Sequence, residues 1–179
     1  YMPFLFMKNY KNTLLDETYQ FAHICQKSYA EAIDKRLPFG ISESAYGELD
    51  QGLNYKYRSF SVPYLTSKES INNEVVISPY SSLMEMSLYP KDVLKNIQKL
   101  KKLNMFFNYG FYDAYDYDRK RIARVCFSHH QGMILMGLTN YLNDDIMKEY
   151  FHSNIKIKAF EILLKEKVQI RANIDMKMD

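Results

Sequence analysis

The chain has 179 residues, of which 47% are apolar and 25% charged, and its formal net charge is +3. This composition excludes a disordered chain, and lysines spread along predicted helices, such as Lys95, Lys99 and Lys102, favour solvated helix faces over a nucleic-acid-binding surface. The longest apolar run, residues 133–138, is far shorter than the roughly 20 residues that span a bilayer, and no signal peptide opens the chain. We therefore predict a single domain over residues 1–179, with no membrane insertion by this segment.

The first predicted element is a helix at residues 14–36. Asn12 or Thr13 can cap its start, and Asp16 lies in its first turn, where the helix dipole favours an acidic side chain. Pro38 prevents the helix from continuing.

A long segment at residues 39–77 follows, in which the 3.6-residue periodicity of a helix is lost. Within it, Tyr55 and Tyr57 alternate with Lys56 and Arg58, so the rings and the charges would lie on opposite sides of an extended backbone. We interpret the segment as a functional loop, because loops longer than about 12–15 residues are otherwise uncommon in compact domains. Core or sheet-edge packing of the two rings stays open as an alternative.

Later segments regain helical periodicity, at residues 79–88, 91–103, 128–142, 144–151 and 155–169, with a second long aromatic loop at residues 104–125. Six helices joined by alternating short turns and long loops predict an all-α fold of the α/α toroid type. Six helices make up about half of such a ring, and one rim of loops would carry the site.

The two cysteines, Cys25 and Cys126, lie about a hundred residues apart among apolar neighbours, so we predict buried free thiols in a reducing compartment. No C-x-x-C pair indicates zinc or redox chemistry. Adjacent His129 and His130 point to different faces of a helix, whereas a helical zinc site needs histidines four residues apart. We predict no metal and no cofactor.

Two carboxylates suggest chemistry on sugars. Glu43 lies in a turn rich in serine and glycine, GISES, where small neighbours allow a ligand to approach, although an exposed loop glutamate without a role stays possible. Asp113 opens the run DAYDYD, which lacks the glycine and closing glutamate of a calcium-binding EF-hand loop. Because glycoside chemistry uses one acid at the leaving oxygen and a second carboxylate across the ring, Glu43 and Asp113 are a candidate pair.

A set of motifs in one order carries a family resemblance over residues 1 to about 171: LLDETY, FGISESAYGELD, NYKYRSFSVP, ISPYSS, YGFYDAYDY, SHHQGMILMGLTNYL and EILLKEKV. Together they resemble the glucoamylase-like domain of cyclic β-1,2-glucan synthases, a bacterial family. The resemblance implies an (α/α)6 toroid that hydrolyses or rearranges β-1,2-glucan. The resemblance covers the later half of that domain. Because the chain begins with Tyr1 and not with an initiator methionine, we expect it to be a piece of a longer protein.

The resemblance also implies roles for individual residues. Glu43 matches the position expected for the general acid or acid/base, and Asp113 replaces the glutamate of the family's GFYEA motif as partner carboxylate or ligand-positioning acid. Phe39 replaces a tryptophan of the family pattern. The positions expected to line the sugar subsites are Tyr46, Tyr57, Arg58, His129, His130 and Gln131.

The expected function is therefore that of a carbohydrate-active domain that binds a β-glucan oligosaccharide or polysaccharide, in the cytoplasm or within an inner-membrane synthase. The alternative is a non-catalytic glucan-binding or structural fragment, and a third possibility is a helical scaffold that binds proteins through its tyrosine-rich loops. Since half a toroid leaves an apolar edge unpaired, we also expect a homodimer or an upstream half-domain to cover that edge.

Overall fold

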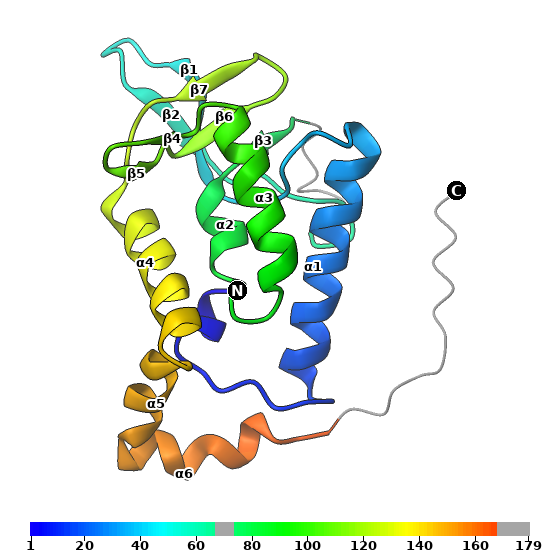
Figure 1. Cartoon of the computed structure of the whole chain (residues 1–179), viewed down its shortest axis with the longest axis vertical. Coiled ribbons are helices and arrows are strands. Elements are labelled where there is room, and N and C mark those ends of the chain that lie inside the picture. The colour runs from blue at the N-terminus through cyan, green and yellow to red at the C-terminus, as the bar shows by residue number, and fades with distance from the viewer. Residues whose placement is uncertain (67–73, 168–179) are drawn as a thin grey trace.

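A computed structural model describes residues 1–66 and 74–167 of the chain (Figure 1). Short strands gather at one end of the described part, helices α1, α3 and α4 extend away from them, and α5 and α6 lie at the opposite end. The helices are η1 (Met2–Leu5), α1 (Leu14–Ile33), α2 (Pro79–Leu83), α3 (Pro90–Lys102), α4 (Ser128–Leu142), α5 (Ile146–Ser153) and α6 (Ile155–Leu164). The strands are β1 (Ser44–Leu49), β2 (Tyr55–Arg58), β3 (Val76–Ile77), β4 (Phe106–Phe107), β5 (Gly110–Phe111), β6 (Ala114–Asp116) and β7 (Arg121–Ala123).

The prediction of an all-α fold is wrong, because both segments interpreted as long loops contain strands. In the described residues, β1 pairs with β2, β4 pairs with β5, and β6 lies between β3 and β7, all antiparallel. Strands β3 to β7 have two or three residues each, too few to show a period of two in the sequence, whereas β2 coincides with the alternation of Tyr55 and Tyr57 with charged residues. The β3–β6 pair, which aligns Val76 with Asp116, also joins segments far apart in the chain.

The six α-helices of the described residues agree with the prediction in number and order and differ mainly at their ends, whereas the short 3-10 helix η1 was not predicted. Thr13 caps α1 with a hydrogen bond from the backbone N–H of Asp16, as predicted, but the helix ends at Ile33 because Asp34 is extended (φ −156°, ψ 123°). The prediction for α4, residues 128–142, is confirmed.

The other helices are shorter or shifted. α2 ends at Leu83 rather than at residue 88, and α3 is displaced by one residue. α5 begins at Ile146 because both residues before it, Asp144 and Asp145, adopt positive φ. α6 ends at Leu164, and the end of its predicted range, beyond residue 167, lies outside the described residues.

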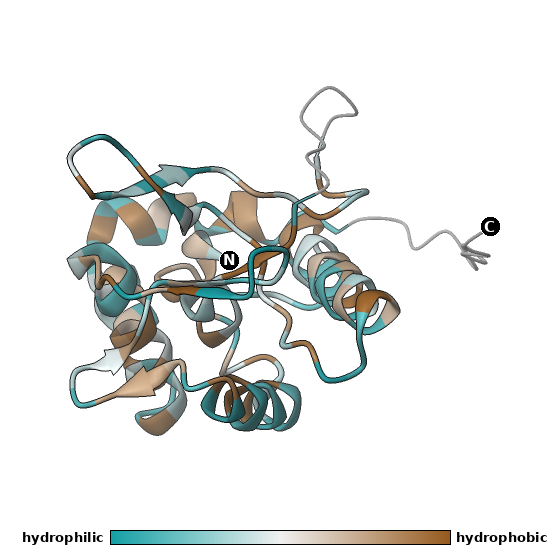
Figure 2. Ribbon diagram, turned by 90° about the horizontal axis from the view of Figure 1, so that it is seen from above, coloured by the Kyte–Doolittle hydropathy of each residue, from teal (hydrophilic) through white to brown (hydrophobic). Residues whose placement is uncertain are grey.

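The core lies where the strands meet the inner faces of the helices. Along α3, Val93, Asn96 and Leu100 are buried, whereas Lys101 and Lys102 of its last turn are exposed, the pattern of an amphipathic helix. In Figure 2, hydrophobic and hydrophilic residues accordingly lie side by side along single helices. None of the described helices is both long and apolar enough to cross a membrane.

The two cysteines are free, but they differ in burial. Cys25 is buried in α1, as predicted. Cys126 is exposed, so the prediction of burial is wrong for it. It lies in the connection between β7 and α4, where its neighbours Val125 and Phe127 pack against the core, and its thiol donates to the carbonyl oxygen of Phe111 at 3.6 Å.

Close packing of α4 on α2 depends on the absence of a side chain at Gly137. A Cβ placed there would lie 2.5 Å from the carbonyl oxygen of Leu83 and 3.2 Å from the Cα of Met84. Both are backbone atoms, so they cannot move aside as the end of a flexible side chain could. Gly132, in the same helix, has no atom within 4 Å of the corresponding position.

We predict that Gly137→Ala lowers the free energy of unfolding by about 1–3 kcal/mol, because the methyl group forces the two helices apart. The matched variant Gly132→Ala should instead raise it by about 0.5–1 kcal/mol, since alanine loses less conformational entropy than glycine in a helix. Urea denaturation of the two variants measures both values. Equal changes in the two would contradict the close contact at Gly137.

Candidate functional site

The backbone on the N-terminal side of Glu43 is held in place by buried polar side chains. Gly40 adopts a positive φ of 127° and turns the chain after Phe39. Gln26, from α1, then bonds both backbone groups of Ile41, donating to its oxygen (2.7 Å) and accepting from its nitrogen (2.8 Å). The hydroxyl of Tyr80 donates to the carbonyl oxygen of Glu43 at 3.0 Å. Glu43 is therefore an exposed side chain on a fixed backbone.

The carboxylate of Glu43 is oriented by Tyr57 on strand β2. The hydroxyl of Tyr57 donates to Oε1 of Glu43 at 2.8 Å. Partial burial, this hydrogen bond and the charge of Glu43 together raise the pKa of Tyr57. Tyr57 therefore remains a protonated donor at neutral pH. Its ring is 38% exposed, so both groups stay accessible from solvent.

His130, near the start of α4, lies directly behind Tyr57. Its Nε2 is 3.4 Å from the hydroxyl of Tyr57, and its Nδ1 is 2.5 Å from Oδ1 of Asp113. Because carboxylate oxygens accept hydrogen bonds, this contact favours the tautomer of His130 that carries its hydrogen on Nδ1 and donates a hydrogen bond to Asp113. The ring of Tyr80 stacks on the imidazole, with 3.8 Å between centroids and an interplanar angle of 13°. His130 is 2% exposed, so its orientation is fixed.

Asp113 precedes β6 and is 2% exposed. Its Oδ1 accepts from His130, and its Oδ2 accepts from the backbone N–H of Ala45 at 2.8 Å. Both carboxylate oxygens are thus engaged within the protein. Since Glu43 is exposed and the side chain of Asp113 is not, the two carboxyls do not face one open space in this conformation.

Asp113, His130, Tyr57 and Glu43 therefore form one continuous series of contacts, which we call the site chain. It runs from a buried carboxylate to an exposed one, and its members come from β2, from α4 and from the residues that precede β1 and β6. Four of the eight predicted site residues are brought together in this way.

The other four predicted residues lie around the site chain. Tyr46 is 6% exposed and its ring packs against that of Phe60. The guanidinium of Arg58 lies 4.8 Å from the centre of the Tyr46 ring and also forms an ion pair with Glu74. The amide of Gln131 donates to the carbonyl oxygen of Phe111 at 2.8 Å. His129 is exposed, and its ring centre is 4.1 Å from that of His130.

Sequence reasoning missed the roles of Tyr80 and Asp116. Tyr80 bonds Ser42 and the backbone of Glu43 and also stacks on His130, so it joins both ends of the site. Asp116 is buried, and its Oδ2 accepts from the backbone N–H of Gly47 at 2.9 Å. The conspicuous motifs ISPYSS and DAYD contain these residues, but neither motif shows which backbone groups they reach.

A second buried histidine has a similar environment. His23 of α1 stacks on Tyr89 at 3.8 Å, and its two ring nitrogens contact the carboxylates of Glu85 (2.7 Å) and Asp92 (3.2 Å). Burial lowers the pKa of His23, but the two carboxylates outweigh that effect, and the net shift is upward. No role for this histidine follows from the sequence motifs.

We predict that Asp113→Asn lowers the free energy of unfolding by about 1–3 kcal/mol. The asparagine amide has one acceptor oxygen where the carboxylate has two, so either the N–H of Ala45 or that of His130 loses its buried partner. Chemical denaturation measures the loss.

Asp144→Asn is the matched control, because Asp144 is exposed and asparagine tolerates its positive φ. It should change the free energy of unfolding by less than about 0.5 kcal/mol. A value for Asp113→Asn that is as small as that of the control would show that its two hydrogen bonds do not stabilise the fold.

Comparison with known proteins gives a consistent result. Residues 1–155 match the model of the Glycoamylase family, described as "Putative glucoamylase". Over 174 residues the chain is 31% identical to the cyclic β-(1,2)-glucan synthase NdvB of Rhizobium meliloti, covering 93% of this chain and 6% of the synthase. The chain thus spans a small part of that relative.

Solved structures share the fold at lower identity. The endo-β-1,2-glucanase of Chitinophaga pinensis is 18% identical, with a TM-score of 0.56, over 78% of this chain and 32% of that one. A β-1,2-glucanase of Parabacteroides distasonis is 17% identical, with a TM-score of 0.62, over 88% of this chain and 22% of that one.

Proposed function

The chain belongs to the Glycoamylase family, and on this premise we propose that it forms part of a glycoside hydrolase-like domain that acts on β-1,2-glucan. The synthase relative and the two solved glucanases support this substrate class, since each is named for β-1,2-linked glucan. Hydrolysis and transglycosylation share the same first half, the cleavage of a glycosidic bond. They differ in whether water or a sugar hydroxyl then takes the glycosyl group.

We propose Glu43 as the general acid or acid/base of this reaction. The observation that carries the proposal is the hydrogen bond from Tyr57 to Glu43, which fixes an exposed carboxyl on a rigid support. A proton donor must lie within hydrogen-bonding reach of the leaving oxygen, so it has to be both accessible and oriented. Glu43 meets both conditions, and the site chain behind it supplies the orientation.

We propose that Asp113 acts as a positioning residue. Direct attack on a sugar would require it to give up the backbone N–H of Ala45 or the imidazole of His130 and to leave its buried position. Its contacts favour an indirect role, in which it sets the tautomer and orientation of His130, and through it the position of Tyr57.

The alternative proposal is a non-catalytic glucan-binding or structural role. It is favoured by the exposure of Glu43 together with the burial of Asp113, the predicted partner carboxylate, which does not face the same space. The toroid architecture, the cytoplasmic or inner-membrane location, and the homodimer or upstream half-domain remain predictions.

We expect Glu43→Gln to reduce cleavage or rearrangement of β-1,2-glucan by about 100-fold or more, because general acid catalysis contributes roughly that much. The measurement is product formation from linear β-1,2-glucan, followed by chromatography, with circular dichroism as the folding check. Glu31→Gln, an exposed carboxyl on α1, is the control and should keep full activity. If the wild-type protein binds the glucan but forms no product, the non-catalytic alternative holds.

Tyr57→Phe removes the hydroxyl that orients Glu43. We expect kcat/KM to fall by about 10- to 100-fold, corresponding to the loss of one hydrogen bond to a charged group. Tyr55→Phe, in the same strand, removes a hydroxyl that donates to the backbone of Ile122 at 3.3 Å, and it should have little effect on the rate. Equal losses in the two variants would mean that Tyr57 acts through the sheet and not through Glu43.

A further inference from the structure

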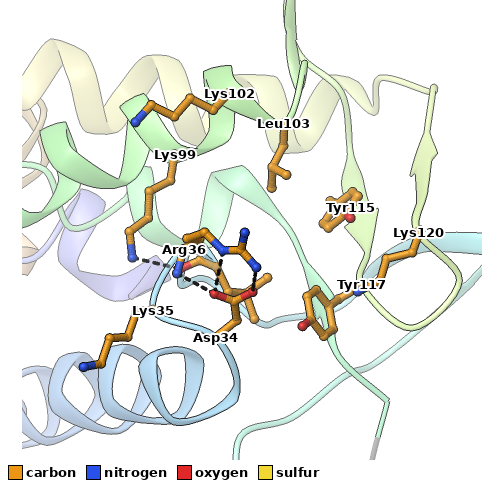
Figure 3. A pocket seen from close by; sticks show the side chains of 10 residues that line it. Asp34, Lys35, Arg36, Lys99, Lys102, Leu103, Tyr115, Tyr117 and Lys120 are labelled. Atoms are coloured by element: carbon orange, nitrogen blue, oxygen red, sulfur yellow. Dashed lines mark hydrogen bonds and ion pairs between the residues drawn. The ribbon is translucent and has the colours of Figure 1, made fainter.

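A cavity of 610 Å³ lies apart from the site chain, between the ends of two helices and strand β6 (Figure 3). We call it the basic cavity. It is lined by Asp34, Lys35, Arg36, Leu37, Lys99, Lys102, Leu103, Tyr115, Tyr117 and Lys120. Its volume falls within the range of about 300–1,000 Å³ that is typical of sites for small molecules.

The lining carries a marked excess of positive charge. Five of its side chains are cationic and one, Asp34, is anionic, which leaves four positive charges. Asp34 is already neutralised by its neighbour, because Arg36 donates to it from Nη2 at 3.0 Å and from Nε at 3.2 Å. These hydrogen bonds lower the pKa of Asp34, so it stays ionised and paired.

The partial negative charges at the C-terminal ends of α1 and α3 offset only part of this net positive charge. The lysines in the last turn of α3 interact favourably with the negative end of the helix dipole, and α1 also ends at the cavity. Each helix end carries a charge of about −0.5, so the two together offset about one positive charge. About three remain without compensation.

The cations differ in whether they already have a partner. Lys99 donates to the carbonyl oxygen of Leu37 at 3.0 Å, and the ammonium of Lys120 lies 3.1 Å from the centre of the Tyr117 ring. Within residues 1–66 and 74–167, the side-chain ammonium groups of Lys35 and Lys102 have no hydrogen bond or ion pair. These two lysines can therefore pair with an added anion.

The opposite wall is aromatic, and the ammonium of Lys120 covers one face of the Tyr117 ring. Alternation along β6 and the residue after it directs Tyr115 and Tyr117 to the cavity, whereas Asp116 between them bonds Gly47 on the other side. Figure 3 shows the two rings across from the lysines of the helical side, with Leu103 and Arg36 between them. A tyrosine face offers a surface on which a flat or ring-shaped group can pack.

We propose that the basic cavity binds a phosphate-bearing small molecule, with the phosphate paired to cations of its lining. Lys35 and Lys102, which extend from the ends of two different helices, supply the ammonium groups that are not yet engaged within the part of the chain that the structure describes. A ring attached to the phosphate would pack against Tyr115 and Tyr117. A phosphate needs several cationic donors, which this lining supplies, and the volume leaves room for a group of sugar size beside it. This site is distinct from the site chain and does not depend on the glucan reaction.

The test is isothermal titration of the full chain, at low and at high salt, with glucose 6-phosphate, inorganic phosphate and glucose. We expect both phosphates to bind, glucose not to bind, and the affinity to fall as salt rises. Tighter binding of glucose 6-phosphate than of inorganic phosphate would assign the site to a sugar phosphate, and equal affinities would assign it to the free ion. Either result supports the proposal.

The double variant Lys35→Gln/Lys102→Gln should lose about tenfold or more in affinity for the bound phosphate. The matched control is the double variant Lys95→Gln/Lys101→Gln, which also removes two positive charges. Like the test variant, it changes one lysine in the last turn of α3, but neither of its two lysines lines the cavity. It should stay within about twofold of wild type. Three results would overturn the proposal: no phosphate binding, equal losses in the two double variants, or tighter binding of a single-stranded oligonucleotide than of either phosphate.

Discussion

The buried carboxylate of Asp113 is the contact on which the rest of the site depends. One of its oxygens holds the backbone of β1 at Ala45, and the other holds His130 at the start of α4. The carboxylate thereby fixes the first strand of one sheet, the start of the next and a helix relative to one another. Removing either partner would leave a buried polar group unsatisfied, so the arrangement is stable only as a whole.

Aromatic rings surround the histidine that is paired with this carboxylate. Tyr80 stacks on His130, and its hydroxyl also reaches the backbone of Glu43, so one side chain links the buried and the exposed parts of the site. The pair formed by His23 and Tyr89 repeats the arrangement beside the buried carboxylate of Glu85. The segment that follows β3 thus carries two tyrosines, each of which stacks on a histidine paired with a carboxylate.

Most of the helical part of the fold could be predicted from the sequence. Helices need only local information, namely a periodic apolar face and a cap such as Thr13, and the prediction of α4 is confirmed in full. The end of α1 is an exception, because the helix stops at Ile33, before Pro38. The strands could not be predicted in the same way. Each is short, and although β1, β4 and β6 each pair with the next strand along the chain, β3 pairs with a distant segment, where Val76 lies opposite Asp116. The β-propensity of the seven short strands in the described residues does not show which strand pairs with which.

For the site, the sequence by itself determined which residue types could do chemistry on sugars. Glu43 and Asp113 stood out as carboxylates in glycine- and tyrosine-rich turns, and the family motifs singled out Tyr57 and His130. Only the tertiary structure decided that one carboxylate is buried and the other exposed, because burial depends on which segments cover a residue. It also decided that Tyr80 joins them and that lysines from two helix ends surround one cavity, since those side chains meet only after distant segments pack together.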